Sequence, residues 1–171
     1  MNRSRSEKTR NQQVLFRPIG IIHTPFKELS GMPIQPKSGK GVRGTIEIFN
    51  EYERGLDDLE GFSHLILLFL FHRSVGYQMK VVPYLDTGER GLFSTRAPKR
   101  PNPIGMSVVR LDRVEGGTVY IQDLDILDGT PLLDIKPFVP EFSAETDIRT
   151  GWLEKVRKRA GKKKSDGRFT Q

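Results

Sequence analysis

Residues 105–124 read GMSVVRLDRVEGGTVYIQDL, and this stretch indicates the fold class of the chain more clearly than any other. Two runs rich in apolar and β-branched residues flank Glu115-Gly116-Gly117. A glycine pair between two such runs is typical of a tight β-hairpin, because glycine tolerates the positive φ angles that short hairpin turns require. We therefore predict two antiparallel strands here, Gly105–Val114 and Thr118–Leu124.

Other strand-like stretches lie before and after this hairpin, and no long helical pattern separates them. They are Val14–Thr24, Gly44–Phe49, Ser63–His72 and Leu132–Phe138. Ser63–His72 is nearly all apolar, which predicts a central strand buried on both faces. The acidic stretch Asn50–Glu60 predicts a short helix with Asn50 as its N-cap. Six or so strands with short helices and long loops predict a mostly β domain, either a small β-barrel or a sandwich.

Several classes of protein are excluded by what the sequence lacks. No GxGxxG motif follows a strand pattern, so a Rossmann-like sheet is not expected. The 171 residues include no cysteine, which excludes disulfides and a cysteine nucleophile. The longest apolar run, Leu65–Phe71, is too short to cross a bilayer, and no apolar signal peptide follows Met1. We expect a soluble cytoplasmic protein with no membrane partner. The histidines, His23, His64 and His72, are too scattered to predict a zinc site, so no metal is expected.

The net charge of +7 is concentrated at the two ends of the chain. Residues 1–13 hold four cations and one acid, and residues 154–171 hold eight cations and two acids, whereas residues 14–153 hold 16 cations and 18 acids. We therefore predict a single domain over 14–153, a basic flexible N-terminal arm and a basic disordered C-terminal tail. Such a tail either adds a salt-dependent attraction to RNA phosphates or only improves solubility, and composition leaves both open.

The segment Phe93–Gly105 contains three prolines, three cations and one asparagine. Proline fixes φ and removes an amide donor, so this segment is predicted as a stiff exposed loop rather than a helix or central strand. It would present Arg96, Lys99, Arg100 and Asn102 in fixed directions, which suits the binding of a phosphate or carboxylate. A proline-rich crossover with solvated charges is the alternative.

Acidic residues gather in a second informative segment, Asp123–Pro137. Asp125 and Asp128 flank a predicted turn, and Asp134 and Lys136 would share one face of the following strand. The Asp134–Lys136 pair is either a plain surface ion pair or a proton acceptor beside a cationic anchor. Two smaller motifs are Pro33-Ile34-Gln35-Pro36, which presents an amide between prolines, and His72-Arg73 at the end of a buried strand, a common position for sites.

Taken together, these motifs resemble one known family. The strings FSTRAPKRPNPIG (93–105) and DGTPLLDIKP (128–137), with further matches at 19–26, 33–36, 61–65 and 71–72, are similar to the TrmO-type tRNA methyltransferase family over roughly residues 14–153. The resemblance implies a small β-barrel that acts as a homodimer and uses S-adenosylmethionine. It also implies methylation of the exocyclic amine nitrogen of threonylcarbamoyl-adenosine at tRNA position 37. Bacterial members often carry a further C-terminal domain, so this chain resembles a compact form.

The resemblance also implies roles for individual residues. Carried over by motif, the cofactor-binding residues are Pro33, Ile34, Gln35, His72, Arg73, Arg96, Met106, Asp125, Ile126, Leu127 and Asp128. Arginine suits the methionine carboxylate of the cofactor and aspartate suits its ammonium group. Lys99, Arg100 and Asn102 are then expected near the tRNA substrate or the dimer interface.

The target nitrogen is conjugated to a carbonyl and is a weak nucleophile, so a base or accurate positioning would help the reaction. Asp134 is the candidate catalytic base, and Lys136 the candidate that steadies a substrate carboxylate or phosphate. A cofactor-binding or RNA-binding module without catalysis, or a methyltransferase for another acceptor, remains an alternative that only turnover separates.

Overall fold

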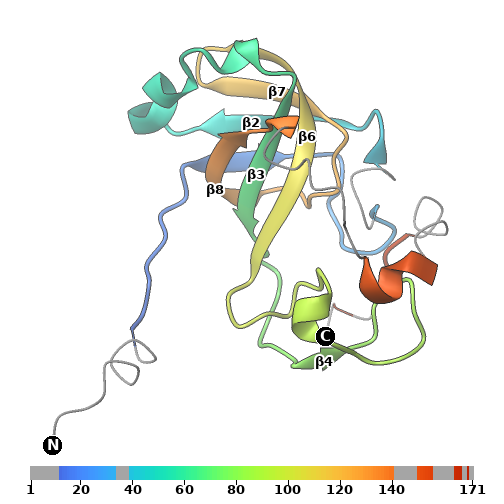
Figure 1. The fold of residues 1–171 in the computed structure, drawn as a ribbon. Coiled ribbons are helices and arrows are strands. Elements are labelled where there is room, and N and C mark those ends of the chain that lie inside the picture. Colours follow the sequence, from blue (N-terminus) through green and yellow to red (C-terminus); the bar gives the residue numbers. More distant parts are fainter. Residues whose placement is uncertain (1–11, 34–38, 141–149, 156–163, 167–168, 170–171) are drawn as a thin grey trace, which may run out of the picture.

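The computed structural model describes residues 12–33, 39–140, 150–155, 164–166 and 169 of the chain. Six antiparallel strands form a closed barrel in the order β1-β2-β7-β6-β3-β8. Figure 1 shows β2, β3, β6, β7 and β8 gathered in this barrel. Their bounds are β1 Gly20–His23, β2 Arg43–Ile48, β3 His64–Leu70, β6 Ile104–Glu115, β7 Thr118–Gln122 and β8 Thr130–Pro137. This confirms the mostly β prediction and selects the barrel over the sandwich. The interior is filled by apolar side chains from every strand, as in other small barrels.

The hairpin predicted from residues 105–124 is present as β6 and β7. Glu115 pairs with Thr118, so Gly116 and Gly117 form a two-residue turn. Gly116 has a φ of +55°, which explains the need for glycine at that position. The carbonyl of Gly117 also accepts a hydrogen bond from the amide of Ile48, which joins this turn to the end of β2.

Strand β3 lies between β6 and β8, but the expectation that both of its faces are buried is wrong. Leu65, Leu67 and Phe69 point into the barrel and are at most 4% exposed. Ile66 and Leu68 lie on the outer face and are only partly buried. The physical reason is closure of the sheet on itself, which gives each strand a single interior face. The apolar character of the outer face therefore needs a separate explanation.

The first strand is shorter than predicted, because β1 begins only at Gly20. Val14, Leu15 and Phe16 are 68%, 86% and 56% exposed and belong to an extended segment that leads away from the barrel in Figure 1. Pro18 has no amide donor, and backbone hydrogen bonding to both neighbouring segments begins only at Ile19, next to the first paired residue, Gly20. Within the part of the chain that the structure describes, no strand therefore pairs with Val14–Pro18.

The acidic stretch after β2 forms two short 3-10 helices, η2 Asn50–Leu56 and η3 Leu59–Gly61, rather than one helix. Phe49 is the N-cap of the first, so the prediction that Asn50 caps the helix is wrong. Asp58 separates the two with a left-handed φ of 66°, which no continuous helix accommodates.

A small lobe beside the barrel was not predicted. It contains the two-stranded ribbon of β4 Lys80–Val81 and β5 Arg90–Gly91, followed by the 3-10 helix η4 Leu92–Ser94. Another 3-10 helix, η6 Gly151–Lys155, contacts this lobe, because the Trp152 indole donates a hydrogen bond of 2.9 Å to the carbonyl of Ser94. Two-residue strands carry no periodicity, so sequence patterns do not reveal them.

Candidate active site

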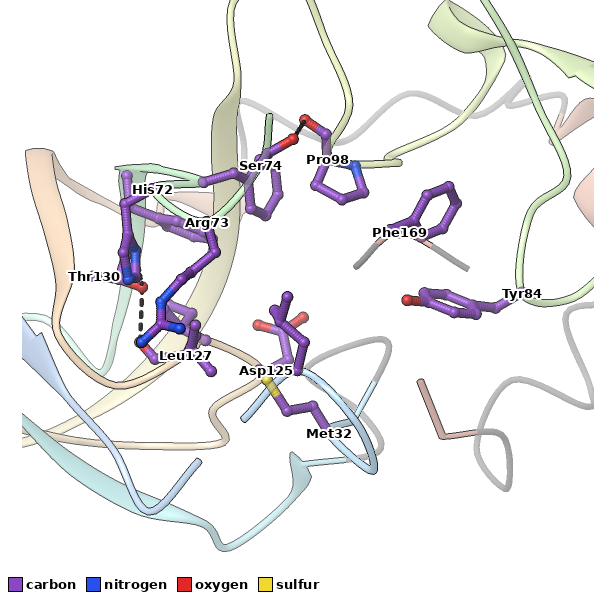
Figure 2. Close-up of a pocket in the computed structure, with 14 residues that line it drawn as sticks. Met32, His72, Arg73, Ser74, Tyr84, Pro98, Asp125, Leu127, Thr130 and Phe169 are labelled. Carbon is purple, nitrogen blue, oxygen red and sulfur yellow. Dashed lines mark hydrogen bonds between the residues drawn. The ribbon is translucent and has the colours of Figure 1, made fainter. Parts of the chain in front are cut away.

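Two adjoining pockets of about 90 Å³ and about 330 Å³ lie where the barrel meets the small lobe. They share the apolar wall residues Leu29, Met32, Phe69, Phe71, Tyr84 and Pro98, and also the carboxylate of Asp125. The first pocket extends to His72, Arg73, Leu127 and Thr130, as Figure 2 shows. The second extends to Arg96, Arg100, Met106 and Ser107. Apolar walls with a few polar groups are typical of small-molecule sites.

Asp125 lies in the turn between β7 and β8 and lines both pockets. Its Oδ1 accepts a hydrogen bond of 2.6 Å from the hydroxyl of Ser107, a side chain 3% exposed on the inner face of β6. Burial raises the pKa of Asp125 to about 6, although the Ser107 hydrogen bond and the charge of Arg96 both act to lower it. A carboxyl group with this pKa changes its charge close to neutral pH.

His72 follows the end of β3 and lies on the same side of the first pocket as Leu127 and Thr130 (Figure 2). Its Nδ1 lies 3.3 Å from the Thr130 hydroxyl, which donates its own proton to the carbonyl of Leu127 at 2.7 Å. The hydroxyl oxygen is therefore left as an acceptor for a proton on Nδ1. Burial and the positive charge of Arg73 lower the pKa of His72, which favours the neutral form of the ring.

Asp128 does not line either pocket, and its side chain instead connects the turn to the segment that follows β1. Its Oδ1 accepts the amide of Thr24 at 2.9 Å, and its Oδ2 lies 2.6 Å from the Lys27 ammonium. Burial acts to raise the pKa of Asp128, but the bonds and charges of Lys27, Thr24 and His23 outweigh it and leave the pKa below its usual value. Because the Thr24 hydroxyl also bonds the carbonyl of Ile126, these contacts fix the turn that presents Asp125.

The proline-rich loop is only partly exposed. Lys99 is 8% exposed and therefore buried, whereas Asn102 is exposed. Arg100 lines the second pocket and donates a hydrogen bond of 3.0 Å to the carbonyl of Thr95, with its guanidinium 5.7 Å from the ring of Phe93. The loop is thus held against the lobe, and the expectation that it displays all four polar residues freely is wrong for Lys99.

Asp134 and Lys136 share the outer face of β8, as the alternation predicted. They pair with Leu68 and Ile66 of β3, and the Lys136 ammonium lies 2.8 Å from the Asp134 carboxylate. Their side chains are 42% and 59% exposed, and neither lines the two pockets.

The predicted cofactor residues other than Asp125 divide into three groups. Pro33, His72, Arg73, Arg96, Met106, Ile126 and Leu127 line one or other pocket. Asp128 supports the turn from behind. Ile34 and Gln35 lie outside the described residues.

The tRNA-methyltransferase O N-terminal domain family matches residues 21–144, which include the barrel and the turn with Asp125. The chain belongs to this family. It is 53% identical, over 91% of its length and 85% of the other, to the "Probable S-adenosyl-L-methionine-binding protein" of Pyrococcus abyssi. It is 40% identical over 142 residues to the tRNA (adenine(37)-N6)-methyltransferase of Mus musculus. The crystal structure of TrmO from Pseudomonas aeruginosa is similar with a TM-score of 0.71 and 41% identity over 82% of this chain.

The share of each relative that this TrmO-type domain matches differs widely. It covers 33% of the mouse enzyme and 62% of the Pseudomonas aeruginosa TrmO chain, but 96% of an S-adenosyl-L-methionine-binding protein of Archaeoglobus fulgidus, to which it is 41% identical. The chain thus matches only part of the long relatives and nearly the whole length of the short one.

Several pocket residues of this TrmO-type domain were missed by sequence reasoning. They are Leu29, Met32, Phe69, Phe71, Tyr84, Ser107, Thr130, Ser165 and Phe169. Ser107 carried a usable signal, because it is a polar residue on the inward-facing positions of β6. The apolar pocket residues carried no such signal, since pocket-wall residues and core residues have the same composition.

Among the described residues, no group of three His, Cys, Asp or Glu side chains gathers as a metal site would require, and no helix has the length and hydropathy of a membrane span.

Proposed function

We propose that this chain is an S-adenosylmethionine-dependent tRNA methyltransferase that methylates the exocyclic amine nitrogen of threonylcarbamoyl-adenosine at position 37. The observation that carries the proposal is the convergence of Arg96 and Asp125 on one pocket with apolar walls. Family membership and the tRNA methyltransferase among the relatives support the same reaction class. A cytoplasmic location follows from a tRNA substrate.

The pocket residues fit the cofactor in charge and in polarity. The Arg96 guanidinium would hold the carboxylate of its methionine end, and ionised Asp125 would hold the ammonium group. Leu127, Met32 and Phe71 provide apolar surface for the adenosine end. When bound, S-adenosylmethionine supplies an electrophilic methyl group. The protein residues bind and orient it, and their apolar walls keep water from the site.

Asp134, the candidate base, does not line the pockets proposed to hold the cofactor of its own subunit. It could act in catalysis only if a second subunit brought it close to such a pocket. The outer face of β3 and β6 next to Asp134 is apolar, with Ile66, Leu68, Ile104 and Met106 partly or fully exposed. We propose that this face is the homodimer interface, since exposed apolar surface of this kind marks protein contacts. Met106 also lines the second pocket, so such a dimer would bring the partner's copy of β8 near the mouth of that pocket.

Asp134 and Lys136 would then serve in the site of the neighbouring subunit. Asp134 would accept the proton that leaves the amine nitrogen, and Lys136 would steady an anionic group of the substrate. Arg100, which faces the second pocket, is the best placed of the three proposed substrate-binding residues. Asn102 is exposed, and buried Lys99 is the least accessible of them.

The test is transfer of labelled methyl from S-adenosylmethionine to tRNA with and without the threonylcarbamoyl group. Transfer only to the modified tRNA is the expected result. Binding of the cofactor without transfer to either tRNA would instead indicate a binding module, a reading that the names of the archaeal relatives favour. Equal transfer to both tRNAs would reject the threonylcarbamoyl-adenosine substrate.

A further inference from the structure

The family match ends at residue 144, yet residues beyond it reach the cofactor pocket. We call Lys164, Ser165, Asp166 and Phe169 the C-terminal wall. Ser165 lines the second pocket and Phe169 lines the first. These residues belong to the segment that sequence reasoning assigned to a disordered tail, and the described part of it makes specific contacts with the body of the domain.

The backbone of the C-terminal wall is hydrogen-bonded to the loop that carries Leu29–Pro33. The amide of Ser165 donates to the carbonyl of Met32 at 2.9 Å, and the amide of Gly31 donates to the carbonyl of Ser165 at 3.2 Å. The Ser165 hydroxyl donates to the carbonyl of Leu29, and Lys164 forms a β-bridge with Pro33. Leu29 and Met32 themselves line both pockets, so these bonds fix one side of the site.

Phe169 anchors the other end of the C-terminal wall. It is 7% exposed and packs with Val81, Leu92 and Ala97 in the core of the small lobe. Its ring meets the ring of Tyr84 edge to face, with centroids 5.0 Å apart and an interplanar angle of 85°. Figure 2 shows Tyr84 and Phe169 on the side of the pocket opposite His72 and Thr130. An aromatic residue held in this way offers a rigid surface to a flat ring.

We propose that Phe169 is a cofactor-binding residue that walls the adenosine end of the pocket, and that Ser165 holds this wall in place. The inference rests on the proposed function. The assignment to the adenosine end follows from where the two cations lie. Arg96, which suits the carboxylate, lines only the second pocket, and Arg73 lies on the His72 side of the first pocket, away from Phe169 (Figure 2). The cofactor therefore lies across both pockets, with Asp125 at their junction.

The experiment measures the dissociation constants of two probes, S-adenosylhomocysteine and 5′-methylthioadenosine, by calorimetry on the full chain. The second probe keeps the adenosine end and lacks the amino acid end. Phe169→Ala is expected to weaken both probes by a similar factor of roughly ten, because each loses the same aromatic contact. Phe169→Tyr should retain most of the affinity. Phe16→Ala is the matched control, since Phe16 is 56% exposed and lines neither pocket.

The outcomes separate the inference from the proposed function. The inference alone is overturned if the wild-type chain binds S-adenosylhomocysteine and Phe169→Ala binds both probes as tightly as the wild type does. A loss confined to S-adenosylhomocysteine overturns the assignment to the adenosine end. A wild-type chain that binds neither probe overturns the proposed function itself.

A second measurement needs no substitution and covers the case in which Phe169→Ala fails to fold. Hydrogen exchange of the wild-type chain is followed with and without saturating S-adenosylhomocysteine. Slower exchange at the Ser165 amide on binding is expected, because the ligand would stabilise the contact between the C-terminal wall and Met32, whose carbonyl accepts the hydrogen bond of that amide. Unchanged exchange at this amide in a chain that binds the ligand overturns the inference.

Discussion

Ser107 on β6 donates its hydroxyl proton to Oδ1 of Asp125 at 2.6 Å, across the junction of the two pockets. A buried serine on the inner face of a barrel strand thereby orients the carboxylate proposed to bind the cofactor ammonium. The hydrogen bond acts to lower the pKa of Asp125, against the larger effect of burial. Ser107 is thus a positioning residue that influences the charge of its partner.

Cofactor affinity is expected to depend on pH through Asp125, whose pKa is about 6. The ionised form binds an ammonium group, so the affinity for S-adenosylhomocysteine should rise as pH increases from 5 to 8. At pH 8, Asp125→Asn should bind S-adenosylhomocysteine at least about tenfold more weakly than the wild type does. Its affinity should also change less between pH 5 and 8. Ser107→Ala should move the midpoint to higher pH, because it removes a bond that lowers the pKa.

Arg96, Arg73 and His72 also line the two pockets, and imidazole is the side chain that ordinarily changes charge near neutral pH. His72→Gln is therefore the control, and its profile should keep the midpoint near 6. A pH profile of cofactor affinity in Asp125→Asn that is identical to the wild-type profile would contradict the prediction.

The raised pKa of Asp125 also affects folding. The folded-state pKa of about 6 lies above the ordinary value of 3.8, so the contribution of Asp125 to the free energy of unfolding is full below pH 3.8 and is lost as pH rises through 6.

Asp134→Asn should reduce single-turnover methyl transfer by a factor of about 10² to 10⁴, the usual range for loss of a general base. Cofactor affinity should stay near wild type, because Asp134 lines neither pocket. The matched control is Glu115→Gln, since Glu115 also belongs to an exposed ion pair, with Arg113. Wild-type transfer rates in Asp134→Asn would leave this residue as a surface ion-pair partner only.

The outer face of β3 can be tested by placing a charge within it. Leu68→Glu should convert a dimer into monomers, since a carboxylate buried in an apolar interface has a large desolvation cost. Light scattering after size-exclusion chromatography gives the mass of the assembly directly. Val75→Glu, at a side chain that is 80% exposed, is the control and should leave the mass unchanged. A wild-type chain that is monomeric at micromolar concentration would refute the interface.

The basic tail can be separated from the C-terminal wall by charge alone. Neutralising Arg157, Lys158 and Arg159 to glutamine should weaken tRNA binding and reduce the slope of log affinity against log salt by about two to three, because each neutralised phosphate adds about 0.7 to 0.9 to that slope. The control exchanges arginine and lysine at the same three positions and keeps the charge. An unaltered slope in the neutral variant, measured between about 50 and 200 mM salt, would rule out this role.

The ring of Phe69 leaves no room for a side chain at Gly105. A Cβ added at Gly105 would overlap atoms of that ring, and both residues line the second pocket. Gly105→Ala should therefore lower the free energy of unfolding by about 1–3 kcal/mol and weaken cofactor binding as the ring shifts. Gly55→Ala is the control, because nothing lies within 4 Å of its added Cβ. Chemical denaturation compares the two, and equal stability would contradict the steric argument.

Much of the barrel could be predicted from local patterns, and the site only in part. The Gly116-Gly117 turn carries its own conformational signal, so the β6–β7 hairpin was predicted to within one or two residues. Burial of Leu68 was mispredicted, because an apolar run does not say which face a closing sheet turns outward. Phe169 was missed because its role depends on packing against Tyr84, which lies far earlier in the chain, and no local pattern reports that packing.

The barrel is closed by a pairing that spans most of the domain, since Gly20 of β1 pairs with Leu132 of β8. During translation, β1 emerges first and must wait until more than a hundred further residues have left the ribosome. Its neighbour β2 can pair with it early, but its other edge stays open as a template for wrong pairing between nascent chains. Long-range closure of this kind also slows folding. Recombinant yield should therefore respond to slower synthesis at low temperature or to added chaperones more than to changes in the final stability of the barrel.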